Sequence, residues 1–187
     1  MGPPLTQKTG KLINQYQRLT ANGINSDSIL VLVQNSTQIN KWREYLLQNL
    51  QVFGSLQIYT YWGFAQAEVE LHWNLVEKAL YGAVKTAKPT FITTEIAHYL
   101  MSLLVSDYRQ TGCLDTIGTP AQLALQIINN MNLAAMSGNY LEEPFLRILE
   151  TETDSERARA IEEALDIAQE FRKNCLESRC FDYSLVV

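Results

Sequence analysis

The amino end of the chain carries residues whose types and spacing could hold the phosphates of a nucleotide. Gly2, Lys8 and Thr9 fall in register on the phosphate-loop pattern GxxxxGK(S/T), and Gln7 stands where the second glycine belongs. In such a loop the lysine neutralises phosphate charge and the hydroxyl binds Mg²⁺. A Cβ atom at Gln7 would obstruct the backbone's approach to phosphate, which argues against hydrolysis. An ordinary polar terminus is the alternative interpretation.

The elements that would position this loop follow it directly. Helical spacing of apolar residues predicts a helix over residues 11–20 that starts at or just before position 9. Residues 29–33 form a short apolar, β-branched run, which is typical of a parallel strand covered on both faces. A helix capped by Asn35 or Ser36 leads to a second strand at residues 56–61. This order predicts a right-handed crossover and a parallel sheet.

The rest of the chain is predicted to be mostly helical. Helices are expected over residues 65–81, 95–105, 119–136 and 153–173, with an extended stretch at 90–93 and a strand at 181–187. We therefore expect residues 1–64 to begin an α/β core, residues 65–174 to form a helical subdomain, and residues 175–187 to return as a core strand. A buried strand at the last residue would be an unusual natural terminus.

Polar and aromatic residues follow each of the first two predicted strands. The first strand ends in Gln34, Asn35 and Ser36, and the second in Thr60, Tyr61, Trp62, Gly63 and Phe64. With the phosphate loop before them, these segments make the chain resemble the first RecA-like domain of UvrD-like superfamily 1 DNA helicases. The resemblance spans nearly the whole chain. It implies a P-loop NTPase-like α/β fold, with helices on both faces of a parallel sheet and an inserted helical subdomain.

The same resemblance assigns roles to these residues. It implies ATP and Mg²⁺ at Gly2, Lys8 and Thr9, with Mg²⁺ on the Thr9 hydroxyl. It also implies contacts with single-stranded DNA, made by Gln34, Asn35, Ser36, Thr60, Tyr61, Trp62 and Phe64. Trp62 stands where the family usually has histidine, and an exposed aromatic side chain there could stack on a base. For Trp62 and Phe64, packing into the core is the alternative.

The resemblance also implies that the chain is a fragment. Its end would be the strand that leads to the Asp-Glu pair of the ATP site, so no catalytic residue is expected within it. The remainder of the helicase, or a partner protein, would supply the second RecA-like domain. Binding of nucleotide and DNA without unwinding is the leading hypothesis. A noncatalytic helicase-like module that binds DNA or protein is the alternative, and an unrelated α/β enzyme is a third.

Composition narrows the remaining choices. The net charge of −5 argues against a generally basic nucleic-acid coat, and no apolar run is long enough to span a membrane, so a cytoplasmic protein is expected. Three cysteines without a C-x-x-C pair are interpreted as reduced thiols rather than a zinc site. Glu68, Glu70 and His72 spread around a predicted helix, and the Arg172-Lys173 pair is interpreted as solvated helix surface.

Overall fold

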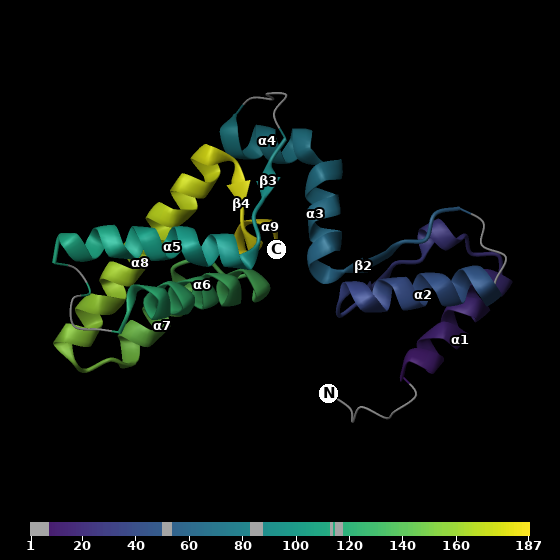
Figure 1. Cartoon of the computed structure of the whole chain (residues 1–187), viewed down its shortest axis with the longest axis horizontal. Coiled ribbons are helices and arrows are strands. Elements are labelled where there is room, and N and C mark those ends of the chain that lie inside the picture. The colour runs from purple at the N-terminus through teal and green to yellow at the C-terminus, as the bar shows by residue number, and fades with distance from the viewer. Residues whose placement is uncertain (1–7, 50–53, 83–87, 113, 115–117) are drawn as a thin grey trace. The chain divides into compact units, whose positions relative to one another are not determined.

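The computed structural model describes residues 8–49, 54–82, 88–112, 114 and 118–187, which are coloured along the chain in Figure 1. Contacts within the chain divide it into two compact units, residues 1–64 and residues 65–187. Each unit has its own cluster of buried apolar side chains. The two units are therefore described separately.

The first unit contains two helices and a pair of parallel strands. Its elements are α1 (Lys8–Ala21), a short 3-10 helix η1 (Ser26–Ser28), β1 (Val31–Val33), α2 (Ser36–Asn49) and β2 (Ile58–Thr60), and the helix α3 (Tyr61–Leu71) begins at its end. Strand β1 pairs with β2 in parallel, with Val31 opposite Ile58 and Val33 opposite Thr60. The parallel pairing expected for these two strands is confirmed.

The apolar core of the first unit lies on one side of this small sheet. Tyr16 of α1, Trp42 and Leu46 of α2, and Ile58 of β2 are buried together, and Val31 packs against them. Side chains alternate along a strand, so the residues next to Val31 point to the other face. Leu30 and Leu32 on that face are 43% and 48% exposed. The described helices therefore cover one face of the sheet.

The second unit is mostly helical. It contains α4 (Trp73–Tyr81), β3 (Thr90–Phe91), α5 (Thr94–Gln110), α6 (Pro120–Met136), α7 (Glu143–Thr151), α8 (Ser155–Ser178), β4 (Cys180–Phe181) and α9 (Tyr183–Val186). Figure 1 shows α5 and α6 side by side, with α8 crossing behind them. Met101, Ile128, Phe145 and Ile167 are almost fully buried where these helices meet. The core of this unit is thus built from helices, with β3 and β4 at its margin.

Side-chain caps fix where two of these helices begin. Thr119 accepts a hydrogen bond from the backbone of Gln122, while the Gln122 side chain accepts one from the Thr119 backbone, and Pro120 occupies the first turn of α6. Asp154 accepts bonds from the backbone N–H groups of Glu156 and Arg157 at the start of α8. Such caps satisfy N–H groups that have no partner within the helix.

The expected RecA-like architecture is wrong for this structure. Among the described residues, strands occur only as two separate parallel pairs, β1 with β2 and β3 with β4, each two or three residues long. The exposed Leu30 and Leu32 further show that α1 and α2 do not sandwich β1 and β2 from both sides. The apolar run at 29–33 suggested that both faces of the sheet are covered. Because every residue in it is apolar, no alternation of polar and apolar side chains shows which face is open.

The strand predicted over residues 181–187 is also wrong. Strand β4 ends at Phe181, and residues 183–186 form the short helix α9. Asp182 stands at the start of α9, where its carboxylate accepts hydrogen bonds from the Ser184 hydroxyl at 2.9 and 3.1 Å. This contact joins two side chains, and Asp182 makes no side-chain capping bond to the backbone of α9.

Candidate functional site

The register of β1 and β2 brings together two segments that are 24 or more residues apart in the sequence. Val33 lies opposite Thr60 in a parallel pair, so both strands end at the same edge of the sheet. Gln34, Asn35 and Ser36 continue from β1, and residues 61–64 continue from β2. We call this the carboxyl edge, and define it by residues 34–36 and 60–64. All of its residues belong to the first unit.

The first half of the carboxyl edge is held by hydrogen bonds at the start of α2. The Asn35 carboxamide oxygen accepts a bond from the Gln38 backbone N–H at 3.0 Å. The Gln38 side chain in turn accepts one from the Gln34 backbone N–H at 2.9 Å. Gln34, Asn35 and Ser36 are all exposed. Asn35 therefore has a structural role as a helix cap, and its side-chain amide nitrogen can still donate to a ligand.

The second half is held in the same way at the start of α3. Thr60 is half-buried, and its hydroxyl oxygen accepts a hydrogen bond from the backbone N–H of Gly63 at 3.0 Å. A Cβ atom on Gly63 would lie 3.1 Å from that hydroxyl oxygen. Glycine at this position thus lets the turn close tightly around Thr60. Helix α3 follows β2 without a connecting loop, which fixes the direction of the next side chains.

The aromatic residues of the carboxyl edge differ in their exposure. Tyr61 is 50% exposed, whereas Trp62 and Phe64 are half-buried. Phe64 packs against Tyr59 of β2, with ring centroids 6.2 Å apart. The contact with Tyr59 explains part of the burial of Phe64. This agrees with the alternative interpretation, in which Phe64 packs into the core. Tyr61 is the side chain with an open aromatic face, which the resemblance did not single out from its neighbours.

The first unit differs in charge from the rest of the chain. Residues 1–64 contain five lysines and arginines but two acidic residues, a formal charge of +3, whereas the whole chain carries −5. The five cations are all exposed: Lys8, Lys11, Arg18, Lys41 and Arg43. The average net charge of the chain conceals this asymmetry. A positive unit attracts polyanions at moderate salt, so the bulk charge does not exclude nucleic acid here.

The predicted phosphate ligands lie at the start of α1. Lys8 and Thr9 occupy the first turn of this 14-residue helix, and both are exposed. Gly2 and Gln7 lie outside the described residues. The first turn of a helix offers backbone N–H groups without helical partners, and the Lys8 ammonium adds positive charge beside them. This part of the predicted site therefore fits a phosphate group in its chemistry.

Other candidate groups have structural explanations. The His72 imidazole lies 3.6 Å from the Glu68 carboxylate, one helical turn away on an exposed surface. Cys175 and Cys180 are free thiols, and burial raises the pKa of Cys175 to about 12. Within the described ranges, no three His, Cys, Asp or Glu residues could together hold a metal ion. In that same part of the chain, no helix is long and apolar enough to cross a membrane.

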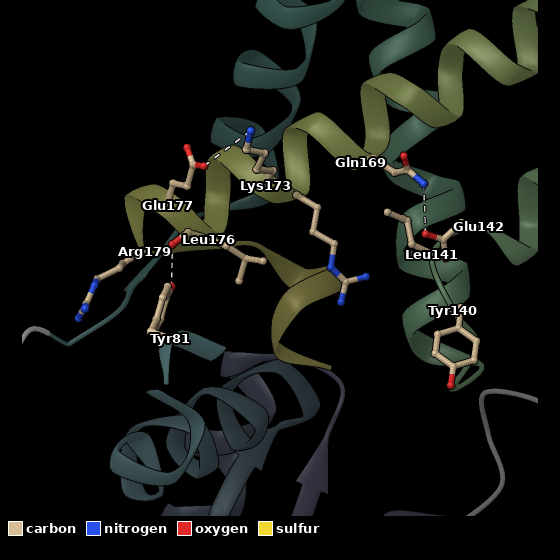
Figure 2. A pocket seen from close by; sticks show the side chains of 10 residues that line it. Tyr81, Tyr140, Leu141, Glu142, Gln169, Lys173, Leu176, Glu177 and Arg179 are labelled. Atoms are coloured by element: carbon tan, nitrogen blue, oxygen red, sulfur yellow. Dashed lines mark hydrogen bonds and ion pairs between the residues drawn. The ribbon is translucent and has the colours of Figure 1, made fainter. Parts of the chain in front are cut away.

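Sequence reasoning missed a cavity in the second unit, because its walls come from three separate parts of the chain. Figure 2 shows the side chains that line it, which come from the end of α4, the turn between α6 and α7, and the second half of α8. At its margin Arg179 donates to the buried Glu77 carboxylate at 2.7 Å. The Arg172-Lys173 pair, predicted to be solvated surface, also lines this cavity. The sequence signal was the cluster of three cations within eight positions.

Comparison of the chain with protein-family models, with curated proteins and with solved structures gives no match. The resemblance to UvrD-like helicases therefore stays a prediction. Functional inference rests on the residues and their geometry.

Proposed function

We propose that this chain is a helicase-related module that binds single-stranded DNA at the carboxyl edge of its first unit. The observation that supports the proposal is the pairing of Val33 with Thr60, because it brings both predicted DNA-contact segments to one edge of one sheet. Two independent segments in one place make a larger surface than either could offer alone.

The chemistry of the carboxyl edge suits a single strand. Tyr61 has an exposed aromatic face on which a base can stack, and stacking tolerates any base. Gln34, Asn35 and Ser36 offer exposed polar groups that can bond to phosphate or sugar oxygens. The five exposed cations of the unit supply the long-range attraction to the phosphate backbone. Duplex DNA presents no free base face to Tyr61, so single strands are the preferred ligand.

A nucleotide contact at Lys8 and Thr9 is the second part of the proposal. Both side chains are exposed in the first turn of α1, where the Lys8 charge would meet phosphate and the Thr9 hydroxyl would meet Mg²⁺ of bound ATP. Titration with a labelled ATP analogue should show weaker binding by Lys8→Ala than by the unmodified chain. A Lys41→Ala variant, which removes an exposed cation from α2, is the control. Equal affinities in all three proteins would refute the role of Lys8.

The DNA contact is tested by fluorescence anisotropy of a labelled oligodeoxythymidine. Tyr61→Ala should weaken binding roughly tenfold, because one stacked base contributes about 1 to 3 kcal/mol and 1.4 kcal/mol is a factor of ten. Tyr99→Ala is a matched control, since Tyr99 is 63% exposed on α5 of the other unit and should leave affinity unchanged. Equal losses in both variants, or no binding by the unmodified chain, would overturn the proposal.

Protein binding is the second candidate, and one observation favours it. Leu30 and Leu32 leave an apolar strip open on the second face of the sheet, and such exposed apolar surface commonly marks contacts with proteins. Under this alternative, replacing Leu32 with lysine would abolish complex formation while Tyr61→Ala would not. The DNA proposal predicts instead that Tyr61→Ala lowers the affinity for an oligonucleotide and that Leu32→Lys does not.

A further inference from the structure

The cavity in the second unit has the size of a small-molecule site. Its volume is about 670 Å³, and ligand pockets commonly enclose roughly 300 to 1,000 Å³. Its walls come from Tyr81 at the end of α4, Tyr140 and Glu142 between α6 and α7, and the second half of α8. All of these residues belong to the second unit, whereas the residues of the carboxyl edge belong to the first.

Three cations line the cavity, and they differ in how far their charges are neutralised. Arg179 is held by Glu77 at 2.7 Å and lies over the Tyr81 ring, 4.9 Å from its centroid. Lys173 lies 3.9 Å from Glu177 on an exposed surface, which is a weak pairing. Arg172 is half-buried, and it has neither a hydrogen bond nor an ion pair within the described part of the chain. Its guanidinium is therefore available for one anionic group.

Aromatic and polar side chains complete the walls. In Figure 2, Tyr81 and Tyr140 stand on opposite sides of the cavity, and α8 runs above both. The Tyr81 hydroxyl donates to the Leu176 carbonyl at 2.6 Å, which fixes its ring, whereas Tyr140 is 80% exposed. An exposed ring at a pocket mouth can stack on a flat ligand. Glu142, which accepts a bond from the Gln169 amide at 3.2 Å, can accept donors from a ligand.

The negative charge of the second unit disfavours ligands with many anionic groups. Residues 65–187 contain ten lysines and arginines and eighteen acidic residues, a formal charge of −8. A polyanion would be repelled by this unit as a whole, while a single phosphate at Arg172 would gain a bidentate, charge-assisted contact. Tyr140 can stack on a flat ring, and Glu142 can accept hydrogen bonds from N–H or O–H donors. A nucleoside monophosphate has all three features.

We propose that this cavity binds a nucleoside monophosphate, with the phosphate on Arg172 and the base against Tyr140. The site is independent of the DNA-binding proposal, because it lies in a different unit and selects against polyanions. Arg179 acts as a fixed part of the wall, since Glu77 already neutralises its charge.

Equilibrium dialysis of radiolabelled AMP against the intact chain tests the proposal. We expect saturable binding at one site, and at least tenfold weaker binding by Arg172→Gln. Tyr140→Ala should weaken binding by several-fold, and because Tyr140 is 80% exposed this variant keeps the fold intact. Adenosine and inorganic phosphate should each compete more weakly than AMP, because each occupies half of the site.

Two matched variants separate the site from general effects. Arg147→Gln removes an exposed, i,i+4-paired cation on α7, and Tyr99→Ala removes an exposed ring on α5; neither residue lines the cavity. Both should bind AMP as the unmodified chain does. Absence of saturable binding, or equal losses for Arg172→Gln and Arg147→Gln, would overturn the proposal. Competition by oligodeoxythymidine as strong as by AMP would also overturn it, and would indicate a strand-binding surface instead.

Discussion

Arg179 and Glu77 form an ion pair that joins two parts of the second unit 102 positions apart in sequence. The Arg179 guanidinium donates to the Glu77 carboxylate at 2.7 Å, and Glu77 has no exposed surface. Arg179 ends α8 with a φ of 54°, in the left-handed region where glycine is the usual residue. Its side chain pairs with the buried Glu77 carboxylate, which a glycine at this position could not do.

Removing one partner of this pair should destabilise the second unit. In Glu77→Ala the guanidinium of Arg179, which is 19% exposed, loses its counter-charge. We expect a loss of about 3 kcal/mol in the free energy of unfolding, at the lower end of the range for broken buried pairs. Urea denaturation followed by circular dichroism measures it.

The control for this loss is an ion pair at the surface. Arg147 lies 3.1 Å from Glu143 one turn away, with side chains 68% and 38% exposed. Arg147→Ala should cost less than about 1 kcal/mol, because exposed pairs contribute little. A similar small loss in both variants would show that the Arg179–Glu77 contact does not hold α4 to the end of α8.

Asp182 should make stability fall as the pH rises. Burial raises the pKa of its carboxyl group, although hydrogen bonds from the Ser184 side chain and nearby backbone N–H groups oppose the shift. The folded state therefore holds this proton more tightly than the unfolded state. Its stabilising contribution is complete below the usual carboxyl pKa and is lost as the pH rises through the folded-state pKa.

The comparison that isolates this effect uses Asp182→Asn, which stays uncharged. Urea midpoints measured from pH 4 to 7 should show the unmodified chain losing stability relative to the variant as the pH increases. Parallel curves for the two proteins would mean that Asp182 titrates normally in the folded state.

Cys175 should be inert in the folded protein. It is 4% exposed, and burial raises the pKa of its thiol to about 12, so almost no thiolate forms at pH 8. Iodoacetamide labelling followed by peptide mass spectrometry should leave Cys175 unmodified, and the same treatment in guanidinium should modify it. Rapid labelling of Cys175 without denaturant would contradict its buried position.

A charged side chain on the open face of the β1–β2 sheet should have little effect on stability. Leu32→Lys should change the free energy of unfolding by less than about 1 kcal/mol, because the side chain is 48% exposed. Leu46→Ala, on the buried side with no exposed surface, should cost about 2 to 5 kcal/mol. Equal losses would show that Leu32 is covered and that the sheet has two buried faces.

Most of the long helices were predicted from the sequence because their signals are local, but α7 was not predicted, and α3 and α4 were expected as one helix. The Thr119-Pro120 pair and the apolar spacing after it predicted a helix over 119–136, and α6 spans Pro120–Met136. The parallel pairing of β1 and β2 also followed from their order along the chain. In both cases the sequence signal lies within one helix or within one strand–helix–strand unit.

The sequence-based predictions were wrong where contacts between distant parts of the chain decide the structure. Residues 181–187 have strand-forming side chains, yet β4 ends at Phe181 and residues 183–186 form a short helix. An apolar run such as residues 29–33 does not reveal which face other elements cover. Likewise, the cavity lined by Tyr81, Tyr140 and Arg172 depends on the packing of α4 and α8, which no local pattern shows.

The most direct test of the DNA-binding proposal is to map the backbone amide signals that shift when single-stranded oligodeoxythymidine is added to the ¹⁵N-labelled chain. The proposal predicts that signals of residues 34–38 and 60–64 shift together and saturate at the same DNA concentration, since these segments share the edge set by Val33 and Thr60. Shifts confined to one segment or to the second unit, or no shifts at all, would contradict it.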